Sequence, residues 1–232
     1  VEFERWVSRP QKSLLEHYHL VLAAYLTERA GQPNPRAAVI SEQARQALTT
    51  VAFANPTVRL TTALFLARFD EQASIDIESL LADSLIERIS HERDFITFPG
   101  AGATPYQRHT ATWLLYALVH EIVALTDFGQ LPATPWLAVR HDAVVRVLLD
   151  AVTWAAAQQN RDLLAELIVT LYFLKEPLHT EVQAALDELV ASQLPDGSWG
   201  ASSTTMRQNK IRHTVLTSAA ALLAYLNWWQ DT

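Results

Sequence analysis

Apolar residues recur along most of the chain at intervals of three and four positions, and strand-like alternation is scarce. This spacing is typical of amphipathic helices that turn one face toward a core. Breaks at Pro, Gly and capping residues divide the pattern into nine predicted helices. Their expected ranges are 11–29, 36–54, 56–69, 75–91, 105–126, 135–159, 161–175, 179–192 and 208–228. We therefore expect an all-α protein of paired antiparallel helices joined by short turns.

Local signals set several of these helix starts. Asn55-Pro56 and Thr134-Pro135 each place Pro directly after a capping residue, and Asn160 begins a further capping sequence. Such pairs are favourable because the cap accepts a free backbone N–H and Pro lacks the N–H that would remain unpaired. The longest loop, 93–104, carries Pro99 and two glycines. It is either a lid over a site or a plain solvent-exposed loop.

Composition narrows the class of protein. The 232 residues show no linker, so we expect a single domain over 1–232. A net charge of −7 and a pI near 5.6 argue against nucleic-acid binding. The absence of Cys excludes disulfides, thiolate nucleophiles and Cys-ligated zinc. Without a visible signal peptide or membrane span, a cytoplasmic protein is the default expectation.

One short motif suggests an architecture. The stretch Gln193-Leu194-Pro195-Asp196-Gly197-Ser198-Trp199-Gly200 resembles a turn that recurs in α/α toroids of the terpenoid-cyclase and protein-prenyltransferase type. The resemblance implies a ring of paired helices whose inner members surround a central cavity. It also implies that the glutamine and tryptophan hold a helix terminus in place rather than catalyse a reaction.

The chain lacks the catalytic motifs of those families. It contains neither Asp-Asp-x-x-Asp nor Asp-x-Asp-Asp, and without Cys it cannot build the prenyltransferase zinc site. The length is also short for the full ring. The expectation that follows is a small or incomplete α/α toroid with its own chemistry and no cofactor.

The predicted helix 105–126 carries the best candidate site. His109, Trp113, Tyr116, His120 and Asp127 are spaced by four, three, four and seven residues, which places them along one helix face. A stripe of imidazoles, aromatic rings and a carboxylate is typical of a polar pocket lining. The alternative is that these residues are ordinary packed or partly exposed side chains.

The last predicted helix offers a partner for this stripe. If both are inner helices, Arg108-His109 and Arg212-His213 converge at one end of the ring, and Arg59 joins them from the third helix. Helix starts and guanidinium groups attract anions, so an anionic or carbonyl-bearing ligand is expected there. The same field lowers the tendency of imidazole to protonate, which makes His109 and His213 the catalytic acid–base candidates.

Metal binding is not predicted. His109 and His120 stand about 16 Å apart along a straight helix and cannot share an ion. His120-Glu121 also lacks the second His of the His-Glu-x-x-His zinc motif. The remaining histidines, including His141 and His179, are expected to be packed or partly exposed side chains without a site role. No nucleophile elbow and no phosphate-cradling glycine loop is present.

Three functions remain open at this stage. The first is a small-molecule biosynthetic enzyme that performs acid–base chemistry or cyclisation in the cavity, with Arg108 and Arg212 orienting the substrate and Trp113 and Tyr116 forming an apolar wall. The second is a non-catalytic helical module that binds a protein or peptide in the same hollow. The third is a scaffold whose centre is filled by side chains. The sequence leaves the oligomeric state unknown.

Overall fold

The structure, a computed structural model, describes residues 13–50, 55–70, 72–195 and 223. Within these ranges the chain forms ten helices and no strand, which confirms the all-α prediction. By their contacts the residues divide into two compact units, Val1–Glu87 and Arg88–Thr232. The single-domain prediction remains a prediction. Apart from residue 223, the helix predicted at 208–228 lies outside the described residues, as does most of the Gln193–Gly200 motif.

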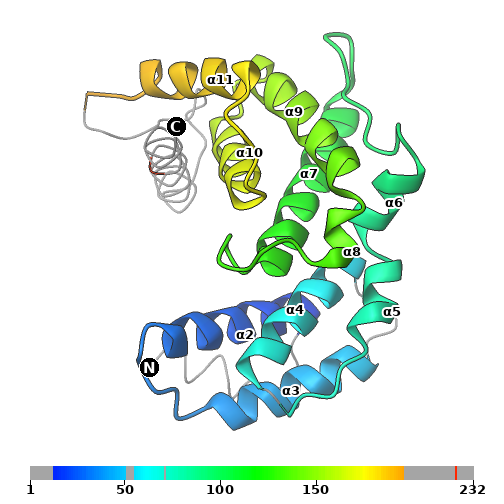
Figure 1. The fold of residues 1–232 in the computed structure, drawn as a ribbon, viewed down its shortest axis with the longest axis vertical. Coiled ribbons are helices and arrows are strands. Elements are labelled where there is room, and N and C mark those ends of the chain that lie inside the picture. Colours follow the sequence, from blue (N-terminus) through cyan, green and yellow to red (C-terminus); the bar gives the residue numbers. More distant parts are fainter. Residues whose placement is uncertain (1–12, 51–54, 71, 196–222, 224–232) are drawn as a thin grey trace. The chain divides into compact units, whose positions relative to one another are not determined.

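The described part of the first unit consists mainly of four helices, α2 to α5, packed against one another (Figure 1). α2 contacts both α3 and α4, and α4 also contacts α5. Phe65 on α4 is fully buried, and its ring centroid lies 6.4 Å from that of Tyr18 and 5.6 Å from that of Tyr25 on α2. The bounds of these helices are α2 Leu14–Arg29, α3 Ala37–Thr50, α4 Pro56–Phe69 and α5 Ile77–Ala82.

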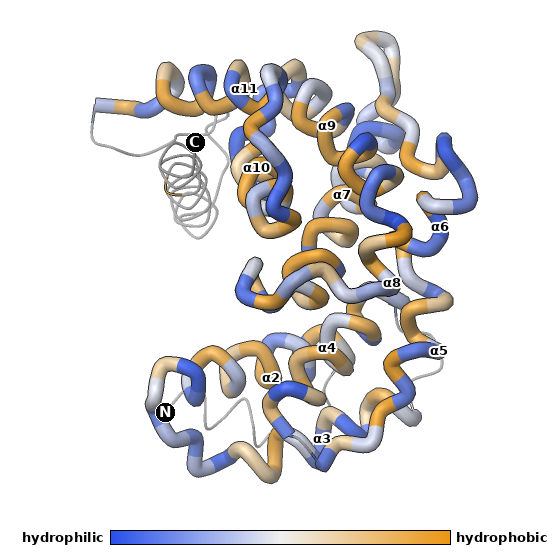
Figure 2. The backbone as a smooth tube through the Cα atoms, viewed as in Figure 1, coloured by the Kyte–Doolittle hydropathy of each residue, from blue (hydrophilic) through white to orange (hydrophobic). Residues whose placement is uncertain are grey.

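The second unit packs its helices around α10. This helix contacts α7, α9 and α11, and Figure 2 shows apolar stretches along α7, α9 and α10. Most residues between Leu163 and Leu171 are buried, so α10 is enclosed on nearly all sides, as expected for a central helix. The bounds are α7 Pro105–Thr126, α8 Pro135–Ala138, α9 His141–Ala157, α10 Arg161–Phe173 and α11 Thr180–Ala191. α6 (Leu85–His91) spans the division between the units.

The predicted helix starts at Pro56, Pro105 and Arg161 are confirmed. The Asn55 side chain accepts the Thr57 N–H at 2.9 Å, and the Asn160 side chain caps α10. Thr104 forms a capping box with Gln107 ahead of Pro105. These contacts span two or three residues, which is why the sequence alone predicts them.

Two predicted helices are broken, and the prediction of continuous helices at 75–91 and 135–159 was wrong. The first break follows from Ser84, whose buried hydroxyl accepts the Glu87 N–H at 3.0 Å and caps α6. At the second break, Arg140 donates to the Trp136 carbonyl at 2.8 Å, and its guanidinium lies 4.3 Å from the Trp136 ring centroid. Hydrophobic periodicity continues through both turns and therefore conceals them.

The end of α7 depends on glycine. Asp127, Phe128 and Gly129 all adopt positive φ, at 50°, 55° and 75°. A Cβ at Gly129 would lie 2.6 Å from the Phe173 ring at the end of α10. Position 129 therefore favours glycine, both for its backbone conformation and for its close approach to α10.

Candidate functional site

The predicted stripe on α7 is largely open to solvent. His109, Trp113 and His120 are exposed, with 54 % of the Trp113 surface accessible. Their common side of the helix matches the spacing argument. His213 and Arg212, the partners predicted from the last helix, lie outside the described residues. The convergence of two histidine-headed helices therefore stays a prediction.

Tyr116 forms an internal bond. Its hydroxyl donates to Asp162 Oδ2 at 2.8 Å and so joins the middle of α7 to the start of α10. Burial raises the pKa of Tyr116 far above its ordinary value, and the charge of Asp162 and this hydrogen bond raise it further. The phenol consequently keeps its proton and acts as a donor.

Three further predicted site residues, Asp127, Arg108 and Arg59, are not part of the exposed stripe on α7. Asp127 is buried at the C-terminal cap of α7, where its N–H donates to the Val123 carbonyl. Arg108 Nη2 donates to the Ala101 carbonyl at 2.9 Å. Arg59 belongs to the first unit, where it lines a separate cleft.

A second feature of the larger unit has the form of a binding site. The segment 89–98 and one side of α9 enclose a cleft of about 490 Å³. Ile89, Ile96 and Val147 are buried and form its apolar floor. This volume lies in the range of small-molecule sites, about 300–1,000 Å³.

Charged groups of both signs surround the cleft. Arg93 and Asp94 come from the loop, and Arg146 and Asp150 stand one turn apart on α9. Within the described part of the chain, none of these four exposed groups forms a hydrogen bond or ion pair with another residue. The four side chains carry no net charge together, and they offer two guanidinium donors and two carboxylate acceptors.

The loop that walls the cleft is fastened at several points. Trp154 on α9 donates its Nε1–H to the Pro99 carbonyl at 3.1 Å, and its ring lies 6.0 Å from that of Phe98. The bond from Arg108 to Ala101 holds the same loop from α7. The segment considered as a lid is thus a supported wall in this structure. Arg108 contributes to the site through the backbone that it holds.

Sequence reasoning did not find the four rim residues. Each is a charged residue on a loop or on the solvent side of a helix, which is the commonest place for such residues. The spacing of Arg146 and Asp150 and the adjacent Arg93-Asp94 pair are the available signals. Neither indicates that the loop and the helix face each other.

A cluster of two histidines and one carboxylate is a further long-range feature. Glu176 Oε1 lies 3.1 Å from His141 Nε2, and Glu176 Oε2 lies 3.0 Å from His179 Nε2. The cluster connects the start of α9 to the turn before α11, and the sequence did not predict a carboxylate partner for either histidine. Among the residues that the structure describes, no group of three or more His, Asp or Glu side chains could hold a metal ion.

In the described part of the chain no helix is both long and apolar enough to span a membrane.

Comparison with known proteins places the chain in a family described as a domain of unknown function. Neither a curated protein nor a solved structure matches the chain. A family model described as "Domain of unknown function (DUF6895)" matches residues 2–222. Because this match covers nearly the whole sequence, the chain belongs to the DUF6895 family.

Proposed function

We propose that the protein binds a small polar molecule that carries both an acidic and a basic group, in the cleft between the loop 89–98 and α9. The observation that carries this proposal is the set of four unpaired charged side chains around a cleft of ligand size. The expected anionic or carbonyl-bearing ligand is compatible with it, because two guanidinium groups stand at the rim.

The chemistry of recognition follows from the rim. A guanidinium offers two parallel N–H donors that match a carboxylate, so Arg93 or Arg146 would hold the acidic end. Asp94 or Asp150 would accept hydrogen bonds from an ammonium group. The apolar floor suits a short hydrocarbon body between the two ends. Since the loop is fastened to α7 and α9, little of the binding energy would go into ordering it.

The toroid is part of the same proposal. Helices adjacent in sequence contact each other, as α2 does with α3, α9 with α10, and α10 with α11. Paired neighbours of this kind are the units from which a small or incomplete α/α toroid is built. The turn at Gln193–Gly200 adds the family resemblance.

The face of α7 is the second candidate site, favoured by the joint exposure of His109 and Trp113. An accessible imidazole beside an indole ring suits either an acid–base step on a small substrate or a contact with a peptide. In the first case the protein is a biosynthetic enzyme with His109 and His213 as acid–base residues. In the second it is an interaction module.

The main test is calorimetric titration of the full chain with free amino acids and dipeptides, alongside matched acids and amines that carry only one charge. Zwitterions should bind, and Arg146→Gln or Asp150→Asn should weaken their affinity about 10-fold or more, because each removes a charge-assisted hydrogen bond. Asp83→Asn, an exposed carboxylate of the first unit, is the control and should change nothing.

The outcomes separate the candidates. Zwitterion binding that is unchanged in both Arg146→Gln and Asp150→Asn would contradict the cleft proposal, as would failure of the zwitterions to bind. A ligand whose affinity depends on His109 and Trp113 but not on Arg146 would instead support the α7 face.

A further inference from the structure

The first unit contains a cleft of its own, separate from the proposed site. Its volume is about 300 Å³, and it is formed by the end of α3, the start of α4 and the segment that leads into α5. Half-buried Leu48, Ile75 and Leu80 are the aliphatic residues in its lining. Arg59 on α4 lies in its wall.

Arg59 brings to this cleft a positive charge that no described residue neutralises. The side chain is half-buried, and its Nε is shielded from solvent without a hydrogen-bond partner. Among the described residues it forms neither an ion pair nor a ring contact. Because Arg59 lines the cleft, its guanidinium charge is available to an anion bound there.

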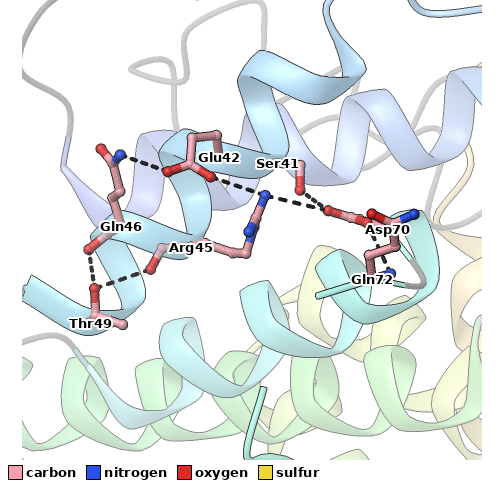
Figure 3. Close-up of polar contacts among 7 residues, drawn as sticks. All are labelled: Ser41, Glu42, Arg45, Gln46, Thr49, Asp70 and Gln72. Atoms are coloured by element: carbon pink, nitrogen blue, oxygen red, sulfur yellow. Dashed lines mark hydrogen bonds and ion pairs between the residues drawn. The ribbon is translucent and has the colours of Figure 1, made fainter. Parts of the chain in front are cut away.

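The other cation at this cleft, Arg45, is already neutralised (Figure 3). Its Nη2 lies 3.0 Å from Glu42 Oε2 and 3.9 Å from Asp70 Oδ2. Asp70 is itself held by the Ser41 hydroxyl and by the Gln72 N–H. Arg45 is therefore fixed within an internal network, and it is Arg59 that can pair with a ligand.

The lining also contains one carboxylate with an assigned role. Asp76 Oδ1 accepts the Ser79 N–H at 3.1 Å and caps α5. Its charge disfavours a multiply charged anion nearby. A ligand with a single negative charge suits the cleft better.

We infer that this cleft binds a small monocarboxylate with an apolar body, whose carboxylate pairs with Arg59 and whose hydrocarbon part covers Leu48, Ile75 and Leu80. The single free guanidinium selects the charged end. The apolar surface selects against a fully hydrated inorganic anion. This inference stands independently of the zwitterion site, because the two clefts share no residue.

The test is titration of the full chain with hexanoate and benzoate, followed by calorimetry and by NMR of the Arg59 side chain. Hexanamide, which keeps the body and loses the charge, and inorganic phosphate, which keeps the charge and loses the body, are the matched probes. The expected result is binding of both carboxylates, with hexanamide and phosphate at least about 10-fold weaker.

Two variants locate the effect. Arg59→Gln should reduce hexanoate affinity about 10-fold or more, and Arg59→Lys, which retains the charge, should retain part of it. Arg36→Gln, an exposed arginine of the first unit that lines neither cleft, should have no effect on hexanoate. Equal binding of hexanoate and hexanamide by the unmodified protein would overturn the inference without any variant. Unchanged affinity in folded Arg59→Gln, tighter binding of phosphate, or no binding at all would overturn it too.

Discussion

At the scale of single residues, burial and hydrogen-bond partners decide what a polar side chain can do. Tyr116 illustrates the point, since its phenol is held against Asp162 across 46 positions of sequence. Burial keeps that phenol protonated, and a protonated phenol cannot serve as a base. Its function is to connect α7 with α10.

Replacing Tyr116 tests this connection. Tyr116→Phe should lower the free energy of unfolding by about 1–3 kcal/mol, because a hydrogen bond to a charged acceptor is lost within a packed region. Urea denaturation followed by circular dichroism measures the change. Tyr106→Phe is the matched control, since 78 % of Tyr106 is exposed and its loss should cost under about 0.5 kcal/mol. Equal effects of the two substitutions would mean that the bond to Asp162 adds no stability.

Helices are positioned by the short turns between them as much as by their apolar faces. α7 ends in three successive residues of positive φ, and this turn brings Gly129 against Phe173 of α10. The close approach fixes how the C-terminal ends of the two helices meet.

A pair of glycine substitutions measures this constraint. Gly31 has a φ of 74°, close to the 75° of Gly129, but a Cβ there meets nothing within 4 Å. Gly31→Ala should therefore lower the free energy of unfolding by about 1–2 kcal/mol, because alanine is strained at this positive φ. Gly129→Ala should lose about 1–3 kcal/mol more, because the new methyl group overlaps the Phe173 ring.

Thermal and urea unfolding of both variants provide the comparison. Adding Phe173→Leu should recover part of the loss in Gly129→Ala and none in Gly31→Ala. Identical losses in the two single variants would show that the contact with Phe173 relaxes freely.

The stability of the whole molecule responds to acid through groups such as Asp70. The Ser41 hydroxyl bond holds the pKa of Asp70 below its ordinary value, helped by the Gln72 N–H and the charge of Arg45 and opposed by burial. The folded state thus binds its proton less readily than the unfolded state. The resulting stability is complete above about pH 4, the ordinary aspartate range, and is lost as the pH falls through the lowered pKa.

Ser41→Ala should remove the largest part of this effect. At pH 7 the variant should be less stable than the parent protein, and the difference should narrow as the pH falls below 4. Urea unfolding at several pH values measures the gap, and carboxyl NMR follows Asp70 directly. Ser74→Ala, an exposed serine, is the control. A gap that stays constant from pH 7 to pH 3 would exclude a contribution from Asp70 ionisation.

The sequence by itself determined the helical class and many of the helix ends. Asn55-Pro56, Thr104-Pro105 and Asn160 act through bonds to residues two or three positions away, so their effect is visible in a short window. The breaks at Ser84 and Arg140 escaped prediction because a serine and an arginine on a periodic pattern do not reveal which groups they will bond.

Only the tertiary structure decided which residues line the two clefts. Spacing placed the α7 stripe along one face, but it cannot say which of those residues are covered, and Asp127 is buried at the cap beyond the helix. Trp154 reaches Pro99 across 55 positions, and this contact shapes the cleft between the loop and α9. Such contacts depend on the packing of whole helices. The sequence therefore cannot show that Arg93, Arg146 and Arg59 line clefts, or that their charges lack a partner among the described residues.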